Sequence, residues 1–98
     1  MVVTILEARV DEGEWDLLRN TYKTLTQEVP PEIKGSYLMQ DQKDKDVWRI
    51  VTLWKSQAAL TAMRQSGEIP TGIVIFNKVG ASPELSVHKV EDAAPKYS

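Results

Sequence analysis

The stretch VWRIVTLWKSQAALTAMRQSG, residues 47–67, predicts a buried strand that is followed at once by a capped helix. Residues 47–54 are mostly apolar, β-branched or aromatic, as is typical of a strand that is buried on both faces. Side-chain alternation divides this strand into two sets, Trp48, Ile50, Thr52 and Trp54 on one face and Val47, Arg49, Val51 and Leu53 on the other. Ser56 is a good N-cap for the helix, and Gly67 a good C-terminal stop.

Residues 2–10 (VVTILEARV) predict an earlier strand that leads into a first helix. Asp11 is expected to cap this helix, because Glu14 lies at capping-box spacing and Val10 and Trp15 occupy the positions of a hydrophobic staple. One apolar stripe at helical spacing follows, formed by Trp15, Leu18, Tyr22, Leu25 and Val29. The pair Pro30-Pro31 is expected to end the helix, because the residue before a proline avoids the α conformation.

Residues 34–40 predict a weaker strand, and the charged segment 41–46 (DQKDKD) predicts a solvated hairpin loop. Two strands joined by so short a loop pair antiparallel. Residues 68–80 fit either a strand or a helix, and the spacing of their apolar residues favours a short helix with Thr71 as a possible cap. Residues 85–91 predict the last strand, and residues 92–98 a polar tail with little to bury.

The expected order of elements is β-α-β-β-α-α-β, which predicts an α+β fold of the ferredoxin-like kind within one domain, residues 1–91. Its antiparallel sheet has helices on one face. The strands are apolar on both faces, and no further element remains to cover the second one. We therefore expect a homodimer in which two copies pair sheet to sheet.

The composition excludes several classes of protein. The net charge is −2 and there is no run of Lys and Arg, so nucleic acid is not an expected partner. No apolar run reaches the length of a membrane span, and no leader peptide is expected. The absence of cysteine fits a cytoplasmic protein, and with one histidine it argues against a metal site.

The strand–helix junction Thr52-x-Trp54-x-Ser56-x-x-Ala59-Leu60 resembles that of the antibiotic biosynthesis monooxygenase family, within the dimeric α+β barrel superfamily. The segments Arg64-x-Ser66-Gly67 and Gly80-x-x-Pro83-x-Leu85-Ser86 are similar to some members. The resemblance covers about residues 2–91 and identifies the fold better than the activity, because the superfamily contains several chemistries.

The resemblance implies a cofactor-independent monooxygenase that acts on an aromatic, polyketide-like or quinol-like small molecule, without metal or flavin. The alternative is a non-catalytic homodimer that binds a small ligand or serves as a scaffold. The haem-degrading branch uses an Asn on the first strand, a Trp in the helix after the junction and a downstream His. Here the comparable positions hold Ala8 and Met63, and the single histidine, His88, lies on the last predicted strand, so haem degradation is not expected.

Six residues are candidates for the site. His88 is the candidate catalytic base, because it alone has an ordinary pKa near neutrality, although it also fits a surface histidine. The candidates for substrate binding are Trp15, Tyr22, Trp54, Arg64 and Asn77. The three aromatic residues fit core packing as well as a pocket wall, whereas the Arg and Asn fit solvated or capping roles as well as contacts to a substrate oxygen.

Overall fold

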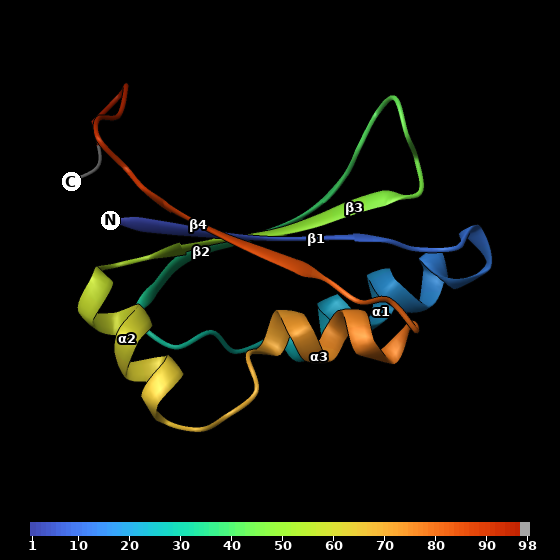
Figure 1. Cartoon of the computed structure of the whole chain (residues 1–98), viewed down its shortest axis with the longest axis horizontal. Helices are drawn as coiled ribbons and strands as arrows, with labels where there is room; N and C mark the ends of the chain where they lie inside the picture. Colours follow the sequence, from blue (N-terminus) through green and yellow to red (C-terminus); the bar gives the residue numbers. More distant parts are fainter. Residues whose placement is uncertain (97–98) are drawn as a thin grey trace.

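The computed structural model describes residues 1–96 and forms a four-stranded antiparallel sheet in the order β2-β3-β1-β4. Its elements are β1 (Val2–Arg9), the 3-10 turn η1 (Glu12–Glu14), α1 (Trp15–Leu25), β2 (Ile33–Gln40), β3 (Val47–Trp54), α2 (Gln57–Gln65), α3 (Thr71–Lys78) and β4 (Glu84–Lys89). All the helices lie on one side of the sheet, which confirms the ferredoxin-like α+β prediction (Figure 1). Residues 92–96 form no helix or strand, and the last two residues of the expected tail lie outside the described part.

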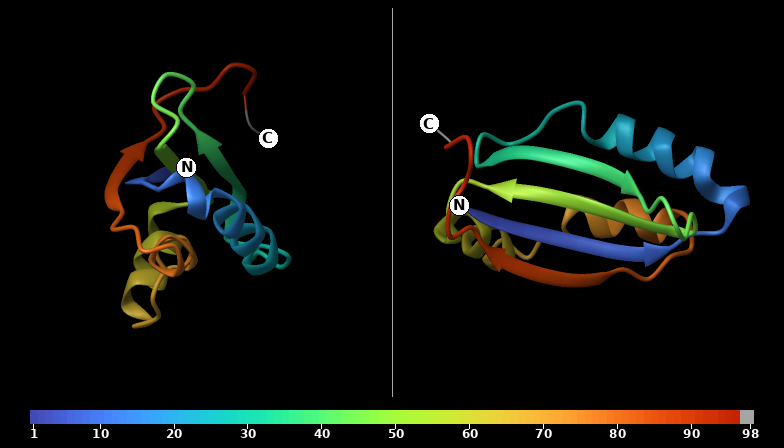
Figure 2. Two further views of the ribbon diagram at one scale, coloured as in Figure 1. Left: turned by 90° about the vertical axis from the view of Figure 1, so that its right-hand side faces the viewer. Right: turned by 90° about the horizontal axis from the view of Figure 1, so that it is seen from above.

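The central strand β3 has the bounds that the sequence predicted, and it pairs with β2 on one side and β1 on the other (Figure 2). Its inward residues Trp48, Ile50 and Trp54 are buried under the helices. Its outward residues are only partly buried, because the helices of residues 1–96 all lie on the other face. The single chain therefore buries only one face of β3, whereas the sequence predicted burial of both faces.

The helix layer is divided into two parts. The helices α1 and α3 pack together over one end of the sheet, where Leu18 and Phe76 are fully buried in a large core cluster. The helix α2 lies at the other end, where Leu60 packs against Val2 and Trp54 in a second, smaller cluster. The helices therefore lie over the two ends of this sheet face. The middle of the face, between the two clusters, has helices beside it but not directly above it.

The start of α1 corrects the expected capping box. The side chain of Asp11 accepts no capping hydrogen bond, and η1 comes between this residue and the helix. The amide of Glu14 instead donates to the backbone carbonyl of Asp11 at 2.8 Å. The Trp15 indole donates to the carbonyl of Val10 at 2.9 Å, so the tight turn is held by backbone acceptors and the indole.

The helix α1 also ends at Leu25, five residues before the predicted stop at Pro30. Thr26 is the C-cap residue, and its amide and its hydroxyl both donate to the carbonyl of Tyr22, at 3.0 and 2.6 Å. Leu25 and Val29, the last members of the predicted stripe, are therefore exposed, and the segment after the helix is free to turn toward β2.

The junction after β3 forms as predicted, since the hydroxyl of Ser56 accepts a hydrogen bond from the amide of Ala59 at 3.1 Å. The ambiguous segment 68–80 is confirmed as a helix, α3, although its N-cap is Pro70 and not Thr71. The helix α2 is followed by Gly67 with a φ of 78°, a left-handed conformation that favours glycine.

The two N-caps predict a difference in stability. Ser56→Ala removes a formed capping bond and should lower the free energy of unfolding by about 0.5–2 kcal/mol. Asp11→Ala removes no side-chain bond and should have the smaller effect in the same urea titration. An Asp11→Ala loss equal to or larger than that of Ser56→Ala would contradict this account of the helix starts.

Candidate functional site

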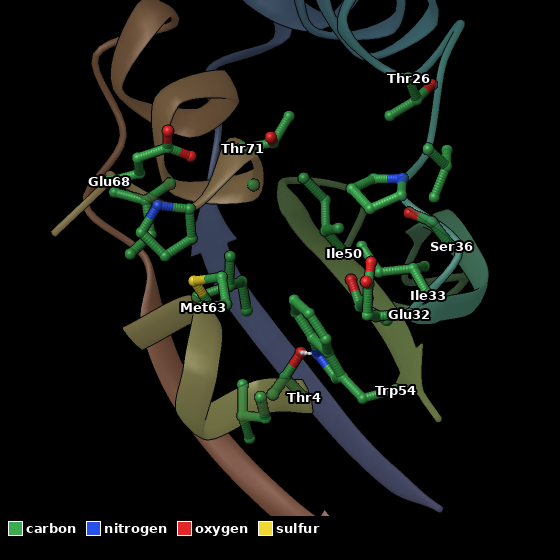
Figure 3. A pocket seen from close by; sticks show the side chains of 18 of the residues that line it. Thr4, Thr26, Glu32, Ile33, Ser36, Ile50, Trp54, Met63, Glu68 and Thr71 are labelled. Carbon is green, nitrogen blue, oxygen red and sulfur yellow. Dashed lines mark hydrogen bonds between the residues drawn. The ribbon is translucent and has the colours of Figure 1, made fainter. Parts of the chain in front are cut away.

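A pocket of about 520 Å³ lies where the helix layer is divided, between the inward face of the sheet and the helices α1, α2 and α3. This volume is in the usual range for a small-molecule site. Figure 3 shows the pocket with Trp54 and Met63 on one side of it and Thr71, from the start of α3, on another. The segment that follows α1 forms a further wall with Val29 and Pro30.

The walls of the pocket are largely apolar. The main apolar lining residues are Leu6, Ile33, Ile50, Trp54, Leu60, Met63, Ile69, Ile73 and Ile75. They come from both core clusters and from the loops between the helices, so the pocket is continuous with the core. An apolar hollow with an indole at its side suits a flat aromatic ligand.

The polar groups of the pocket include four hydroxyls with defined surroundings. The indole of Trp54 donates to Thr4 Oγ1 at 3.0 Å, and Thr4 is buried. The hydroxyls of Tyr22 and Ser36 share a hydrogen bond of 2.8 Å across the gap between α1 and β2. Thr52 lies between these two pairs on the central strand.

The ionisable side chains at the pocket, apart from Tyr22, are Glu28, Glu32, Arg64 and Glu68. All four residues are exposed, so they lie at the rim, where water solvates their charges. In Figure 3 Glu32 and Glu68 come from opposite sides of the pocket. The rim therefore provides carboxylates that can accept a proton from a bound molecule, and one guanidinium that can donate to an oxygen.

The structure brings together three of the six candidate residues. Tyr22, Trp54 and Arg64 all line the pocket, Trp54 from β3 and the others from α1 and α2. Trp15 does not line it, since its ring packs against Trp48 at the far end of α1 with the centroids 6.0 Å apart.

Asn77 and His88 lie away from the pocket. Asn77 is exposed near the end of α3. His88 pairs with Val3 across β4 and β1, and directly paired residues of antiparallel strands point to the same face. That face is the outward one, because the flanking Val2 and Thr4 are buried under the helices. The imidazole there contacts Ser86 Oγ at 3.0 Å.

Sequence reasoning missed the inward hydroxyls Thr4, Thr52 and Ser36. A signal existed, since Thr4 and Thr52 are polar residues at inward positions of otherwise apolar strands. Of the two positions compared with the haem-degrading branch, Met63 lines the pocket, whereas Ala8 is buried in the larger core cluster.

Two features are absent from residues 1–96, a membrane-spanning helix and a cluster of metal-ligating side chains. None of the helices in this range is both long and apolar enough to cross a membrane. The same residues contain no group of three or more His, Cys, Asp or Glu side chains that could together hold a metal ion.

Solved structures with the same fold include oxygenases and proteins of unstated function. A conserved protein from Methanosarcina mazei Go1 superposes with a TM-score of 0.71 at 14% identity, over 90% of each chain. SnoaB from Streptomyces nogalater, described as a cofactor-independent oxygenase, superposes with a TM-score of 0.65 at 14% identity over 97% of each chain. The heme-degrader MhuD from Mycobacterium tuberculosis gives 0.63 at 24% identity, over 93% of this chain and 96% of its own.

At these identities, the structural likeness establishes the fold alone. A comparison with curated protein sequences finds no significant match. The family model for antibiotic biosynthesis monooxygenase matches residues 1–71, a range that includes β1, β3 and the junction into α2. The chain therefore belongs to the antibiotic biosynthesis monooxygenase family.

Proposed function

We propose that the protein is a cofactor-independent monooxygenase that oxidises a small aromatic molecule in the pocket between the sheet and the helices. The observation that carries the proposal is the apolar pocket of about 520 Å³ with Trp54 at its side and carboxylates at its rim. The family and the cofactor-independent oxygenase among the structural neighbours support this chemistry.

The reaction needs a substrate that is itself electron-rich once it has lost a proton. In anthrone, loss of a methylene proton gives a stabilised anion. The former methylene carbon then gives four electrons to O₂ in total. One atom of O₂ becomes the oxygen of a new C=O bond on this carbon. The other atom leaves as water, which contains the two methylene hydrogens. The protein binds the flat ring, accepts the proton and keeps bulk water away from the anion.

A rim carboxylate is the proton acceptor in this proposal. Glu32 and Glu68 line the pocket from opposite sides (Figure 3). Arg64 at the same rim offers a charged donor for an oxygen on which the negative charge develops. The buried interior supplies hydroxyls for orientation.

We also propose that the protein acts as a homodimer formed through the outward face of the sheet. This face carries the apolar residues Val3, Ile5, Tyr37, Met39, Val51 and Leu53. Tyr37 is 53% exposed and Met39 is 44% exposed in the single chain. The β2–β3 loop and the segment after β4 rise on this side, so they flank the face (Figure 1).

The charged groups at the centre of the outward face, Arg49 and Glu7, are already paired within one chain, whereas Glu84, opposite Glu7 on the edge strand β4, is exposed and has no ion-pair partner within residues 1–96. Arg49 donates to Glu7 at 2.7 Å and to Asp41 at 3.2 Å. The pKa of the Asp41 carboxyl lies below its ordinary value of 3.8. The main cause is the hydrogen bond from the Asp44 amide, and the second is the hydrogen bond from Arg49. A second copy can cover the paired groups without supplying an opposite charge, which supports pairing of like faces.

Oxygen consumption tests the proposed activity. We expect uptake with at least one member of a panel of anthrones, naphthols and quinols. Met63→Glu puts a charge on the apolar wall and should lower kcat/KM about tenfold or more. Ala58→Glu places the same charge on an exposed position of α2 outside the pocket and should leave the rate unchanged. Binding of these compounds with no uptake by the wild type would favour the non-catalytic alternative.

The position of His88 gives a second prediction. Because its ring lies on the outward face, His88→Gln should retain turnover and avoid the roughly 10²–10⁴-fold loss that follows removal of a general base. Measurement of kcat from pH 5 to 9 on an active substrate checks this. If His88→Gln keeps the oligomeric state of the wild type and still loses turnover by that factor, His88 is the general base and the prediction is wrong.

Sedimentation equilibrium tests the dimer. The wild type should have the mass of two chains at micromolar concentration. Val51→Lys puts a charge in the middle of the outward face and should give single chains, because a desolvated, unpaired ammonium is costly. Thr24→Lys adds the same charge to the exposed side of α1 and should leave the dimer intact. A wild type of single-chain mass contradicts the proposal.

A further inference from the structure

The linker between α2 and α3, residues 66–70 (SGEIP), forms part of the wall of the pocket. In Figure 1 it spans the space between the two helices as a long arch, on the side away from the sheet. Four of its residues line the pocket, namely Ser66, Glu68, Ile69 and Pro70. A change in the path of this linker therefore changes the shape of the pocket.

The linker is hydrogen-bonded to the rest of the protein only at its two ends. The amide and the hydroxyl of Ser66 donate to the last turn of α2, and the carbonyl of Pro70 accepts from the first turn of α3. Between these ends, within the described residues, one hydrogen bond is formed, and it is local, from the amide of Glu68 to Ser66 Oγ at 3.2 Å. The middle of the linker can therefore move without breaking a bond to the sheet or to a helix.

The two helices that the linker joins are fixed to the core, so movement is confined to the linker. Leu60 of α2 and Phe76 of α3 are buried. The start of α3 lies directly on the sheet, because a Cβ atom added to Gly72 would lie 2.6 Å from Leu6 Cδ1. Gly67, with a φ of 78°, provides a hinge position whose backbone is not restricted by a side chain.

The linker carries an exposed apolar side chain, Ile69. This side chain is 66% exposed although it lines the pocket, and it belongs to neither core cluster. Leu85 on β4 is a second exposed apolar side chain of the pocket lining. A ligand in the pocket gives both side chains an apolar surface to contact. Because removal of apolar surface from water is favourable, a bound ligand favours a linker conformation in which Ile69 packs on it.

We propose that residues 66–70 form a strap that closes over the bound ligand, and that Ile69 is the ligand-contacting residue of this strap. The inference rests on the proposed function for its pocket. It adds a residue that determines affinity and a closing step that the open pocket requires. Closure keeps water out of the apolar interior, where the proposed reaction forms an anion.

Binding of 2-naphthol to the full chain under nitrogen tests the role of Ile69 without turnover, because the proposed reaction needs O₂. Ile69→Ala should raise the Kd about three- to tenfold, since it removes apolar contact with the ligand. Its urea midpoint should equal that of the wild type, because Ile69 lies outside the core clusters. Ile69→Leu keeps the apolar volume and should bind as the wild type does. Leu17→Ala truncates an exposed side chain outside the pocket and should leave the Kd unchanged.

Amide hydrogen exchange detects the closure itself. The amides of Gly67, Glu68 and Ile69 should exchange rapidly in the free protein and about tenfold or more slowly with saturating 2-naphthol, because closure shields them from water. The amides of Ala93 and Ala94, in a segment outside the pocket, should exchange at the same rate in both states.

Four results would overturn the inference: no binding of 2-naphthol by the wild type, an unchanged Kd in Ile69→Ala, a lowered urea midpoint in Ile69→Ala, or unchanged exchange of the linker amides at saturation. These outcomes are separate from the fate of the proposed activity. Closure of the linker on 2-naphthol supports the inference even if no compound is oxidised. Oxygen uptake with the same KM in Ile69→Ala and the wild type supports the activity and contradicts the strap.

Discussion

The structure depends on how its helices cover one face of the sheet. They pack on this face at its two ends, in two separate clusters. The helices α1 and α3 bury Leu18 and Phe76 over one end, and α2 buries Leu60 over the other. Neither group extends across the middle of the sheet. The pocket occupies this middle, so it follows from the division of the helix layer and not from a missing side chain.

The same division explains the chemistry of the pocket. Its walls are core residues such as Ile50 and Trp54, which make it apolar. Its rim carries the exposed Glu32, from the segment between α1 and β2, and the exposed Glu68, from the segment between α2 and α3. Apolar depth and a charged rim suit a flat ligand that loses a proton at its edge. Within the described part of the chain, no helix covers the opposite face of the sheet, which supports the proposal that it pairs with a second copy.

Local patterns predicted most of the fold, and long-range geometry limited prediction of the site. The bounds of β3 and the Ser56 cap depend on neighbouring residues, so the sequence was sufficient for them. The early end of α1 at Leu25 has no signal in the apolar stripe, which continues at helical spacing to Val29. The position of His88 relative to the pocket depends on how β4 pairs with β1, which cannot be read from one strand alone.

The most direct test of the central claim uses two methionines on opposite faces of the sheet. Met63 lines the pocket, and Met39 lies on the outward face with 44% exposure. With labelled methionine methyl groups, NMR titration by 1,4-naphthoquinone should shift the Met63 signal and give nuclear Overhauser effects between this methyl and the ligand. The Met39 signal should remain in place. A ligand that contacts Met39 and leaves Met63 unchanged would contradict the account of where this fold binds small molecules.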